Sequence, residues 1–190
     1  MKINAVIFGI LTYTVTKKQP VETCQNRLPI KSGLKITEFF TGTWFTTHMK
    51  DASDLASCRE YKFQQNPQGI LLTYTGQVPD SNKPYAVTCS SNGTVVSLNA
   101  SAPIPFNCVQ KYTTAYHAPG KEFSSLGFSV IETDYTEYGF LYRCTQFNGE
   151  QNSYGIYILL HRSKTGDGSK ANDILKKSGM DLPKFKKYSC

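Results

Sequence analysis

Charged residues are scarce in this sequence. They make up 18% of the 190 residues, whereas aromatic residues make up 13%, with 12 tyrosines and 11 phenylalanines but a single tryptophan. Disordered chains are rich in charge and poor in aromatic residues, so this composition argues against a largely disordered protein. A chain of this length can bury a substantial core, and its aromatic content favours packed β-strands.

Histidine is also rare, and the usual catalytic motifs are missing. The three histidines, His48, His117 and His161, have no cysteine or second histidine at a metal-ligand spacing, so we expect no metal site. No GxSxG, P-loop or HExxH motif occurs. Glu132 and Asp134 could pair for acid–base chemistry, but an aspartate at that position is typical of a turn. We therefore predict no catalytic residues and no enzyme.

The sequence contains no basic run interleaved with aromatic residues, although the formal net charge is +7. Its lysines and arginines are scattered, which argues against a nucleic-acid partner. A net positive charge attracts phosphates, carboxylates, heparin-like glycans or acidic protein surfaces, without selecting one of them.

Long hydrophobic runs are absent except at the amino terminus. Met1 and Lys2 precede an uncharged apolar segment from Ile3 to Val15. The segment is shorter than the roughly 20 residues of a membrane-spanning helix, and a signal peptide over residues 1–16 fits it better than a buried first strand. We expect one domain over residues 17–190, secreted and extracellular, with no membrane association after cleavage.

The six cysteines contain no CxxC pair, which disfavours a zinc ribbon or a redox motif. An even number in a secreted chain predicts three disulfides, although the sequence alone does not choose their pairing. Two sequons predict N-glycosylation at Asn92 and Asn99.

Eight short segments rich in tyrosine, phenylalanine and β-branched residues, each bounded by turn residues, predict an all-β fold. They cover residues 43–49, 57–65, 69–78, 84–90, 105–112, 123–133, 138–147 and 153–162. A short amphipathic segment over 34–40 precedes them. Residues 169–178 predict a helix that Ser169 caps and Gly179 ends. Eight antiparallel strands can close into an up-and-down barrel that holds side chains or one small ligand.

Three short motifs in this setting resemble the conserved regions of lipocalins. They are Gly42-Thr43-Trp44 on the first strand, Thr133-Asp134-Tyr135 between the sixth and seventh strands, and Arg162 at the end of the eighth. In lipocalins the tryptophan crosses the closed end of the barrel, the arginine packs over it and the turn lies beside them. The resemblance therefore implies a calycin barrel closed by Gly42, Trp44, Thr133, Asp134, Tyr135 and Arg162.

A longer similarity points to the triabin-like salivary lipocalins of triatomine bugs. It is carried by residues 58–62, 83–85 and 129–135 and by the tail from Ile174 to Cys190. The resemblance implies secretion in saliva and three disulfides, Cys24–Cys144, Cys58–Cys190 and Cys89–Cys108. Family members impair host haemostasis: some sequester eicosanoids such as thromboxane or prostaglandins, some bind biogenic amines, and one obstructs thrombin.

Haem is the rival ligand within the wider family, because nitrophorins hold it through a histidine near the third and fourth strands. Residues 69–91 of this chain contain no histidine. We therefore expect no haem and no other cofactor.

Strand alternation selects candidate ligand-binding residues on the first two strands. If Trp44 points inward at the base, His48 points inward nearer the mouth. On the second strand Arg59, Tyr61 and Phe63 share one face, and Arg59 at the rim could hold a carboxylate. The same pattern fits ordinary barrel filling by Tyr61 and Phe63 with a solvated Arg59.

The seventh strand leaves two registers open. Phe140 and Tyr142 form one inward-facing set, and Leu141 and Arg143 form the other. We take Phe140 and Tyr142 as the candidates.

These observations predict a monomer that sequesters a small amphipathic ligand, first of all an anionic lipid mediator such as an eicosanoid, and thereby inhibits platelet aggregation. The net charge and Arg59 favour an anion over an amine, for which no cavity carboxylate can be placed. The alternative is a filled barrel that serves as a scaffold, with its loops or basic surface binding a protease such as thrombin or a platelet receptor.

Overall fold

The computed structural model describes residues 24–25, 28–52, 56–77, 84–112, 123–148 and 153–190. The expected signal peptide over residues 1–16 lies outside these residues, as does His117.

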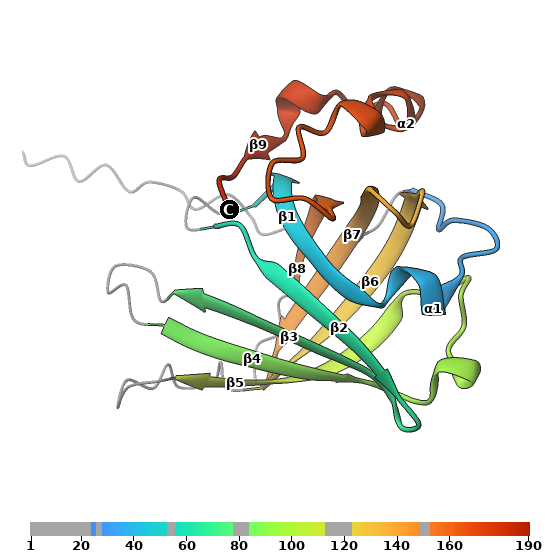
Figure 1. Ribbon diagram of the computed structural model, residues 1–190, viewed down its shortest axis with the longest axis vertical. Coiled ribbons are helices and arrows are strands. Elements are labelled where there is room, and N and C mark those ends of the chain that lie inside the picture. Colours follow the sequence, from blue (N-terminus) through green and yellow to red (C-terminus); the bar gives the residue numbers. More distant parts are fainter. Residues whose placement is uncertain (1–23, 26–27, 53–55, 78–83, 113–122, 149–152) are drawn as a thin grey trace, which may run out of the picture.

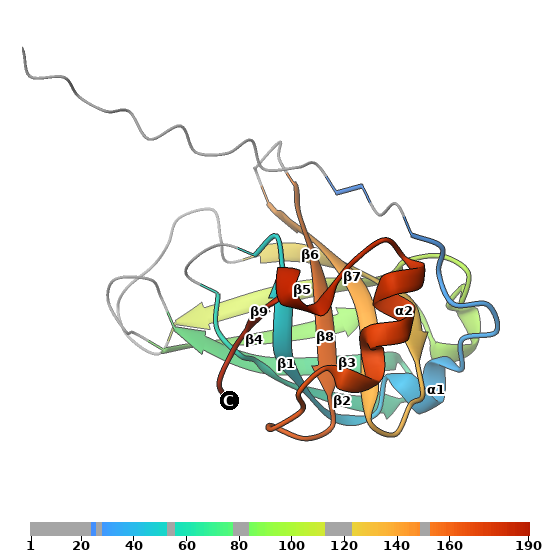
Figure 2. The ribbon, with the colours of Figure 1, turned by 90° about the horizontal axis from the view of Figure 1, so that it is seen from above.

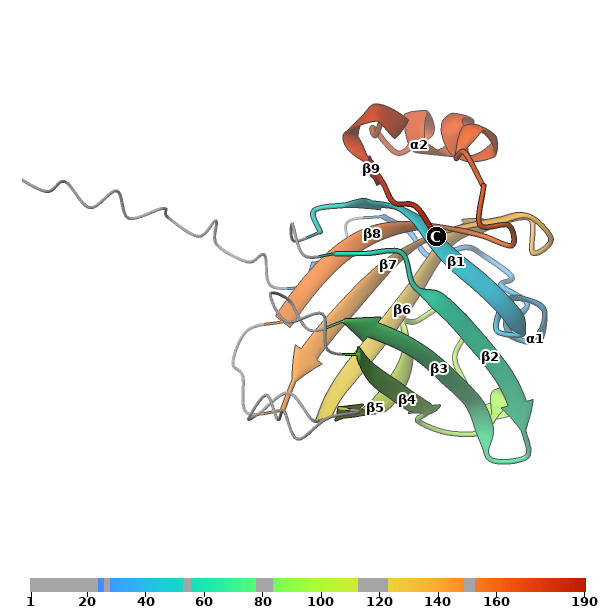
Figure 3. The ribbon, with the colours of Figure 1, turned by 60° about the vertical axis from the view of Figure 1, so that its left-hand side comes forward.

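Eight antiparallel strands form a closed up-and-down barrel, which confirms the predicted fold class (Figures 1 and 3). Consecutive strands pair in order, and β8 pairs with β1, so the eight strands close into a barrel. The strands are β1 (Gly42–Lys50), β2 (Glu60–Asn66), β3 (Gly69–Gln77), β4 (Pro84–Ser91), β5 (Ile104–Tyr112), β6 (Phe123–Thr133), β7 (Tyr138–Phe147) and β8 (Ser153–His161).

Most strand limits lie within one residue of the predicted ones, but β2 begins three residues late, at Glu60. Ahead of β2, the Arg59 amide donates to Thr46 Oγ1 (2.6 Å) and the Arg59 carbonyl accepts from the Thr46 amide (2.9 Å). Cys58 is bound to Cys190, so the carboxyl terminus holds this segment beside β1.

A one-turn helix, α1 (Ile36–Phe39), lies across one end of the barrel, where the amphipathic segment 34–40 is predicted (Figure 1). Phe39 and Phe40 are fully buried there. A second short turn, η1 (Val95–Ser97), lies between β4 and β5.

The C-terminal segment covers part of the outer face of the barrel, at β1, β7 and β8 (Figure 2). It consists of η2 (Ser169–Ala171), α2 (Asn172–Lys177), η3 (Leu182–Lys184) and β9 (Lys186–Lys187), which pairs with β1. Gly179 ends α2 with a φ of 70°, as predicted. The prediction that Ser169 caps the helix is wrong, because its amide and hydroxyl both bind Asp167 Oδ1 and make a separate turn ahead of α2.

Candidate functional site

The closed end of the barrel is built around Trp44. Its indole Nε1 donates to the Phe39 carbonyl (2.8 Å), and the Arg162 guanidinium carbon lies 3.6 Å from the ring centroid. Arg162 also donates to the carbonyls of Glu38 on α1 (3.4 Å), Thr41 (2.6 Å), Thr43 (3.0 Å) and Tyr135 (3.2 and 3.3 Å). A stacked, fully hydrogen-bonded guanidinium therefore ties α1, β1 and the β6–β7 turn together.

The β6–β7 turn is shaped by the side chains of Thr133 and Asp134. Asp134 Oδ1 accepts from the amides of Thr136, Glu137 and Tyr138, at 2.8–3.1 Å. Thr133 Oγ1 donates to the Tyr138 carbonyl. Asp134 thus acts as a turn residue, as expected from its sequence position.

Two residues at the closed end adopt left-handed backbone conformations. Tyr135 has a φ of 67°, which turns its carbonyl toward Arg162. Gly42 has a φ of 64°, and a Cβ at this position would lie 3.4 Å from Arg162 Nη1. A glycine fits there because it adopts this left-handed backbone conformation without the strain that a side chain would bring.

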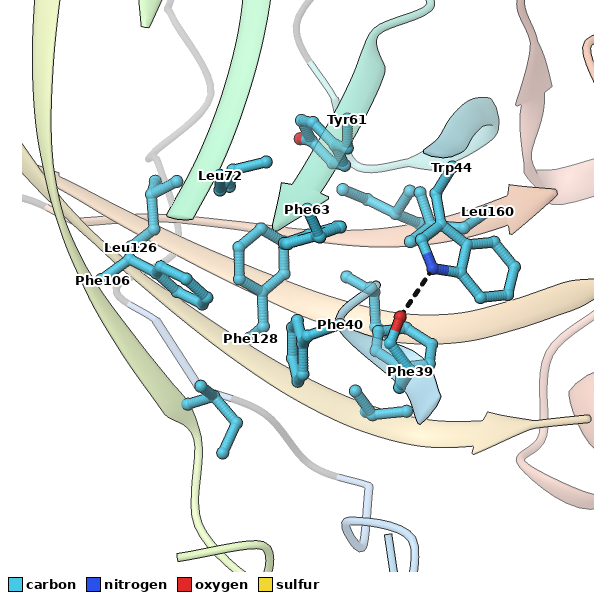
Figure 4. Packing of buried hydrophobic residues seen from close by; sticks show 14 of the residues in the cluster. Phe39, Phe40, Trp44, Tyr61, Phe63, Leu72, Phe106, Leu126, Phe128 and Leu160 are labelled. Carbon is cyan, nitrogen blue, oxygen red and sulfur yellow. Dashed lines mark hydrogen bonds between the residues drawn. The ribbon is translucent and has the colours of Figure 1, made fainter. Parts of the chain in front are cut away.

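Above the tryptophan, phenylalanine side chains pack against one another in the lower part of the barrel (Figure 4). Phe40 contacts Phe63, Phe106 and Phe128 with ring centroids 5.3–6.3 Å apart. With Phe39, Trp44 and Arg162 these residues form a layer that we call the floor. Its aromatic rings are between 0% and 2% exposed, so the floor is a packed core.

The next layer toward the open end is polar. Tyr61 lies on the same face of β2 as Phe63 but nearer the open end. Arg143 lies opposite it on β7, and Arg143 Nη1 donates a hydrogen bond to the Tyr61 hydroxyl (2.6 Å). Arg59 lies above Tyr61, and its guanidinium is 5.4 Å from the Tyr74 ring centroid. Tyr85 lies near enough to Arg59 to act on its charge, and we call Arg59, Tyr61, Tyr74, Tyr85 and Arg143 the arginine–tyrosine cluster.

The two guanidinium groups of the cluster are incompletely satisfied. The Nε atoms of Arg59 and Arg143 are buried, and neither has a hydrogen-bond partner among the described residues. Within the same part of the chain, no carboxylate lies at ion-pair distance from either group. Buried polar atoms without partners are rare, and each is suited to a partner such as a water molecule, an ion or a ligand.

The charges of the cluster act on its phenols. Burial favours the neutral Tyr61 phenol, but the nearby charges of Arg143 and Arg59 outweigh it and lower the Tyr61 pKa below its usual value. Burial raises the pKa of Tyr74 to about 12, so Tyr74 stays neutral. The Tyr61 oxygen is therefore the acceptor that both arginines face.

The expectation that His48 faces the interior is wrong. A bulge shifts the β1–β8 register between Thr46 and His48, so the alternation that starts at Trp44 is interrupted. Met49 joins the inner core instead. His48 lies on the outer face under the C-terminal segment, where Thr47 Oγ1 binds both His48 Nδ1 (2.9 Å) and His161 Nδ1 (2.6 Å).

The prediction that Phe140 and Tyr142 face the interior is also wrong. The other register, with Leu141 and Arg143 inside, is the one that the structure shows. Phe140 and Tyr142 point outward and pack with Tyr157, Leu175 and Phe185 beneath the C-terminal segment. Leu141 and Arg143 face the interior. Of the six predicted ligand-binding residues, only Arg59, Tyr61 and Phe63 lie inside, with Phe63 in the floor.

The described residues hold no group of three histidine, cysteine or acidic side chains able to bind a metal ion. Nor does this part of the chain contain a helix long and apolar enough to cross a membrane. Glu132 forms an ion pair with Lys31, apart from the turn that Asp134 shapes.

A sequence model of the triabin family matches residues 14–174. The chain belongs to the triabin family. Triafestin-1 of Triatoma infestans is 28% identical over 184 residues, which cover 95% of this chain and 86% of that protein.

Solved structures share the fold of this triabin-family protein. A crystal structure of an LTBP1 mutant in complex with leukotriene C4 is 26% identical, with a TM-score of 0.63, and covers 85% of this chain and 91% of that one. The tryptamine complex of the amine-binding protein of Rhodnius prolixus has a TM-score of 0.65 at 19% identity, and covers 87% and 86% of the two chains.

Three disulfides cross-link this triabin-family barrel, and their pairing is the one implied by the resemblance to triabin-like lipocalins. Cys24–Cys144 and Cys58–Cys190 join the two terminal segments to the barrel wall. Cys89–Cys108 links directly paired positions of β4 and β5 and points into the core. The two sequon asparagines, Asn92 and Asn99, are exposed between these strands.

Proposed function

We propose that this protein is a secreted salivary binder that sequesters a small anionic amphipathic mediator of the host, such as an eicosanoid, and thereby inhibits platelet aggregation. The observation that carries the proposal is a pair of arginines with buried Nε atoms that converge on Tyr61 without a carboxylate among the described residues.

The energetics of burial favour an anion at this position. Two guanidinium groups in a low-dielectric interior repel each other and lose hydration, and one phenol compensates them only in part. A carboxylate accepts several charge-assisted hydrogen bonds and cancels one charge. An apolar tail on the same molecule would lie against the tyrosine rings of the barrel wall.

The same charges disfavour an amine. A cationic ligand needs an interior carboxylate, whereas the cluster supplies two positive charges, Arg59 and Arg143. The likeness to the amine-binding protein, at 19% identity, concerns the fold alone. The likeness to LTBP1, solved with leukotriene C4, supports a lipid mediator.

Removal of a mediator by binding needs no catalytic group, and it consumes protein in proportion to the ligand. Such a protein must be abundant and durable outside the cell. The three disulfides support this role, because each restricts the unfolded chain. Cleavage after residue 16 and release into saliva complete the proposal.

Calorimetric titration tests the proposal with three ligands: a thromboxane analogue with a free carboxylic acid, its methyl ester, and tryptamine. We expect the acid to bind and the ester to bind at least thirtyfold more weakly, since a buried charge pair contributes about 2 kcal/mol or more. Tryptamine should give no heat.

The variant Arg143→Met should bind the acid more weakly than the wild type by a similar factor. Lys176→Met is the matched control, because it removes one exposed positive charge on α2 and should bind the acid normally. Equal affinity for acid and ester, or tight binding of thrombin by a protein that takes up none of the ligands, would refute the proposal.

A further inference from the structure

Thr145 is the third buried polar group of the interior without a described partner. Its hydroxyl oxygen is buried, the residue is 8% exposed, and no hydrogen-bond partner occurs among the described residues. A threonine in a strand usually exposes its hydroxyl to water or hydrogen-bonds it to a neighbour.

The side chain of Thr145 faces the barrel interior. Cys144, the preceding residue, is bonded to Cys24 on the outside, and Gln146, the following one, is exposed. Alternation then places Thr145 on the same face of β7 as Arg143. Its paired neighbours are Leu126 on β6, a core residue, and Tyr154 on β8.

Thr145 lies on the open side of Arg143, away from the floor. Because β7 runs from the closed end upward, Leu141, Arg143 and Thr145 follow one another toward the mouth, with about 7 Å between successive Cα atoms on this face. The floor beneath Arg143 is packed with aromatic rings, so a ligand whose acid binds Arg143 can extend only upward, past Thr145.

We infer that the Thr145 hydroxyl is a second polar contact for this ligand, which selects an acid that carries a hydroxyl or carbonyl group in the half of the molecule nearest its carboxylate. This inference rests on the proposed function and narrows the ligand class from amphipathic acids in general to oxygenated ones. Thr145 would then be a specificity-determining residue.

The physical reason is the asymmetry of buried hydrogen bonds. An unoxygenated acid would cover the Thr145 hydroxyl with hydrocarbon and leave it unpaired, whereas an oxygen on the ligand would pair with it. Sites built to hydrogen-bond a ligand oxygen discriminate against analogues that lack it. One neutral hydrogen bond of this kind changes affinity about five- to tenfold.

Calorimetry with three soluble acids of equal length tests the inference: dodecanoic acid, 5-hydroxydodecanoic acid and 12-hydroxydodecanoic acid. The 5-hydroxy acid should bind about five- to tenfold more tightly than dodecanoic acid. The 12-hydroxy acid should show no gain, because its hydroxyl lies at the far end of the chain.

The variant Thr145→Val keeps the side-chain shape and removes the hydroxyl. It should abolish the preference for the 5-hydroxy acid and bind dodecanoic acid within about twofold of the wild type. Thr88→Val makes the same replacement at an exposed position of β4 and should retain the preference.

The outcomes separate this inference from the proposed function. If the wild type binds all three acids equally, or if Thr145→Val keeps the preference, the inference is wrong while anion sequestration stands. If none of the acids binds and the thromboxane analogue also fails, the proposed function is wrong as well.

Discussion

The floor and the arginine–tyrosine cluster are built from the same kinds of side chain, yet they differ in how the guanidinium groups are satisfied. Arg162 of the floor stacks on Trp44 and donates to the main-chain carbonyls of Glu38 on α1, Thr43 on β1 and Tyr135 in the β6–β7 turn. Arg59 and Arg143 lie beside tyrosines, and their Nε atoms have no partner in the described part of the chain. An arginine surrounded by backbone acceptors stabilises the fold, whereas one buried without them is suited to bind an anion.

The largest effect is expected from a cavity in the floor. Phe128→Ala removes a fully buried ring that contacts Phe40, Phe63 and Phe106, and should lower the free energy of unfolding by about 3–5 kcal/mol. Urea denaturation measures this loss. A loss below about 1 kcal/mol would show that the floor is loosely packed and would remove the contrast between the two layers.

A smaller effect should separate the two kinds of arginine. Arg162→Met leaves several carbonyls without their donor and should cost about 2 kcal/mol of stability. Arg143→Met replaces a poorly compensated buried charge with an apolar side chain and should leave stability unchanged or raise it. Thermal and urea unfolding of both variants gives the comparison, and equal losses in the two would contradict it.

The smallest effect is a pH dependence on the outside of the barrel. Burial, together with the nearby charges of His161 and Lys187, lowers the pKa of His48 to about 4, although Asp167 opposes the shift. Burial also lowers the pKa of His161. As the pH falls, these histidines are therefore protonated in the unfolded chain before they are protonated in the folded one. The free energy of unfolding should fall by on the order of 1 kcal/mol as the pH drops from 6.5 toward 4.

The variant His48→Gln isolates this contribution from the carboxylates that titrate in the same range. Its unfolding free energy should fall less than that of the wild type between pH 7 and pH 5, by urea denaturation. Identical slopes in the two proteins would mean that His48 does not titrate as its buried position under β9 requires.

The strands could be predicted from the sequence because short aromatic and β-branched segments alternate with turn residues. The bulge in β1 could not, because Thr46-Thr47-His48 carries no glycine or other signal for the extra residue. Without the bulge, alternation assigns His48 to the wrong face.

The register of β7 was ambiguous for a different reason. Both of its faces are apolar, because the C-terminal segment buries Phe140 and Tyr142 on the outside while Leu141 faces the core. Alternation identifies the inner face only when the outer one meets water. The apolar face of α2, with Leu175, was the available signal, since it needs an apolar partner on the barrel wall.

The most direct test of the central claim is a crystal structure of the protein with a bound acid that carries a bromine at its tail. Anion binding at the cluster predicts the carboxylate within about 3 Å of the Arg143 guanidinium, between Arg59 and Tyr61, and the bromine toward the open end. A carboxylate at the mouth or on the outer surface, with the Arg143–Tyr61 hydrogen bond undisturbed, would contradict it.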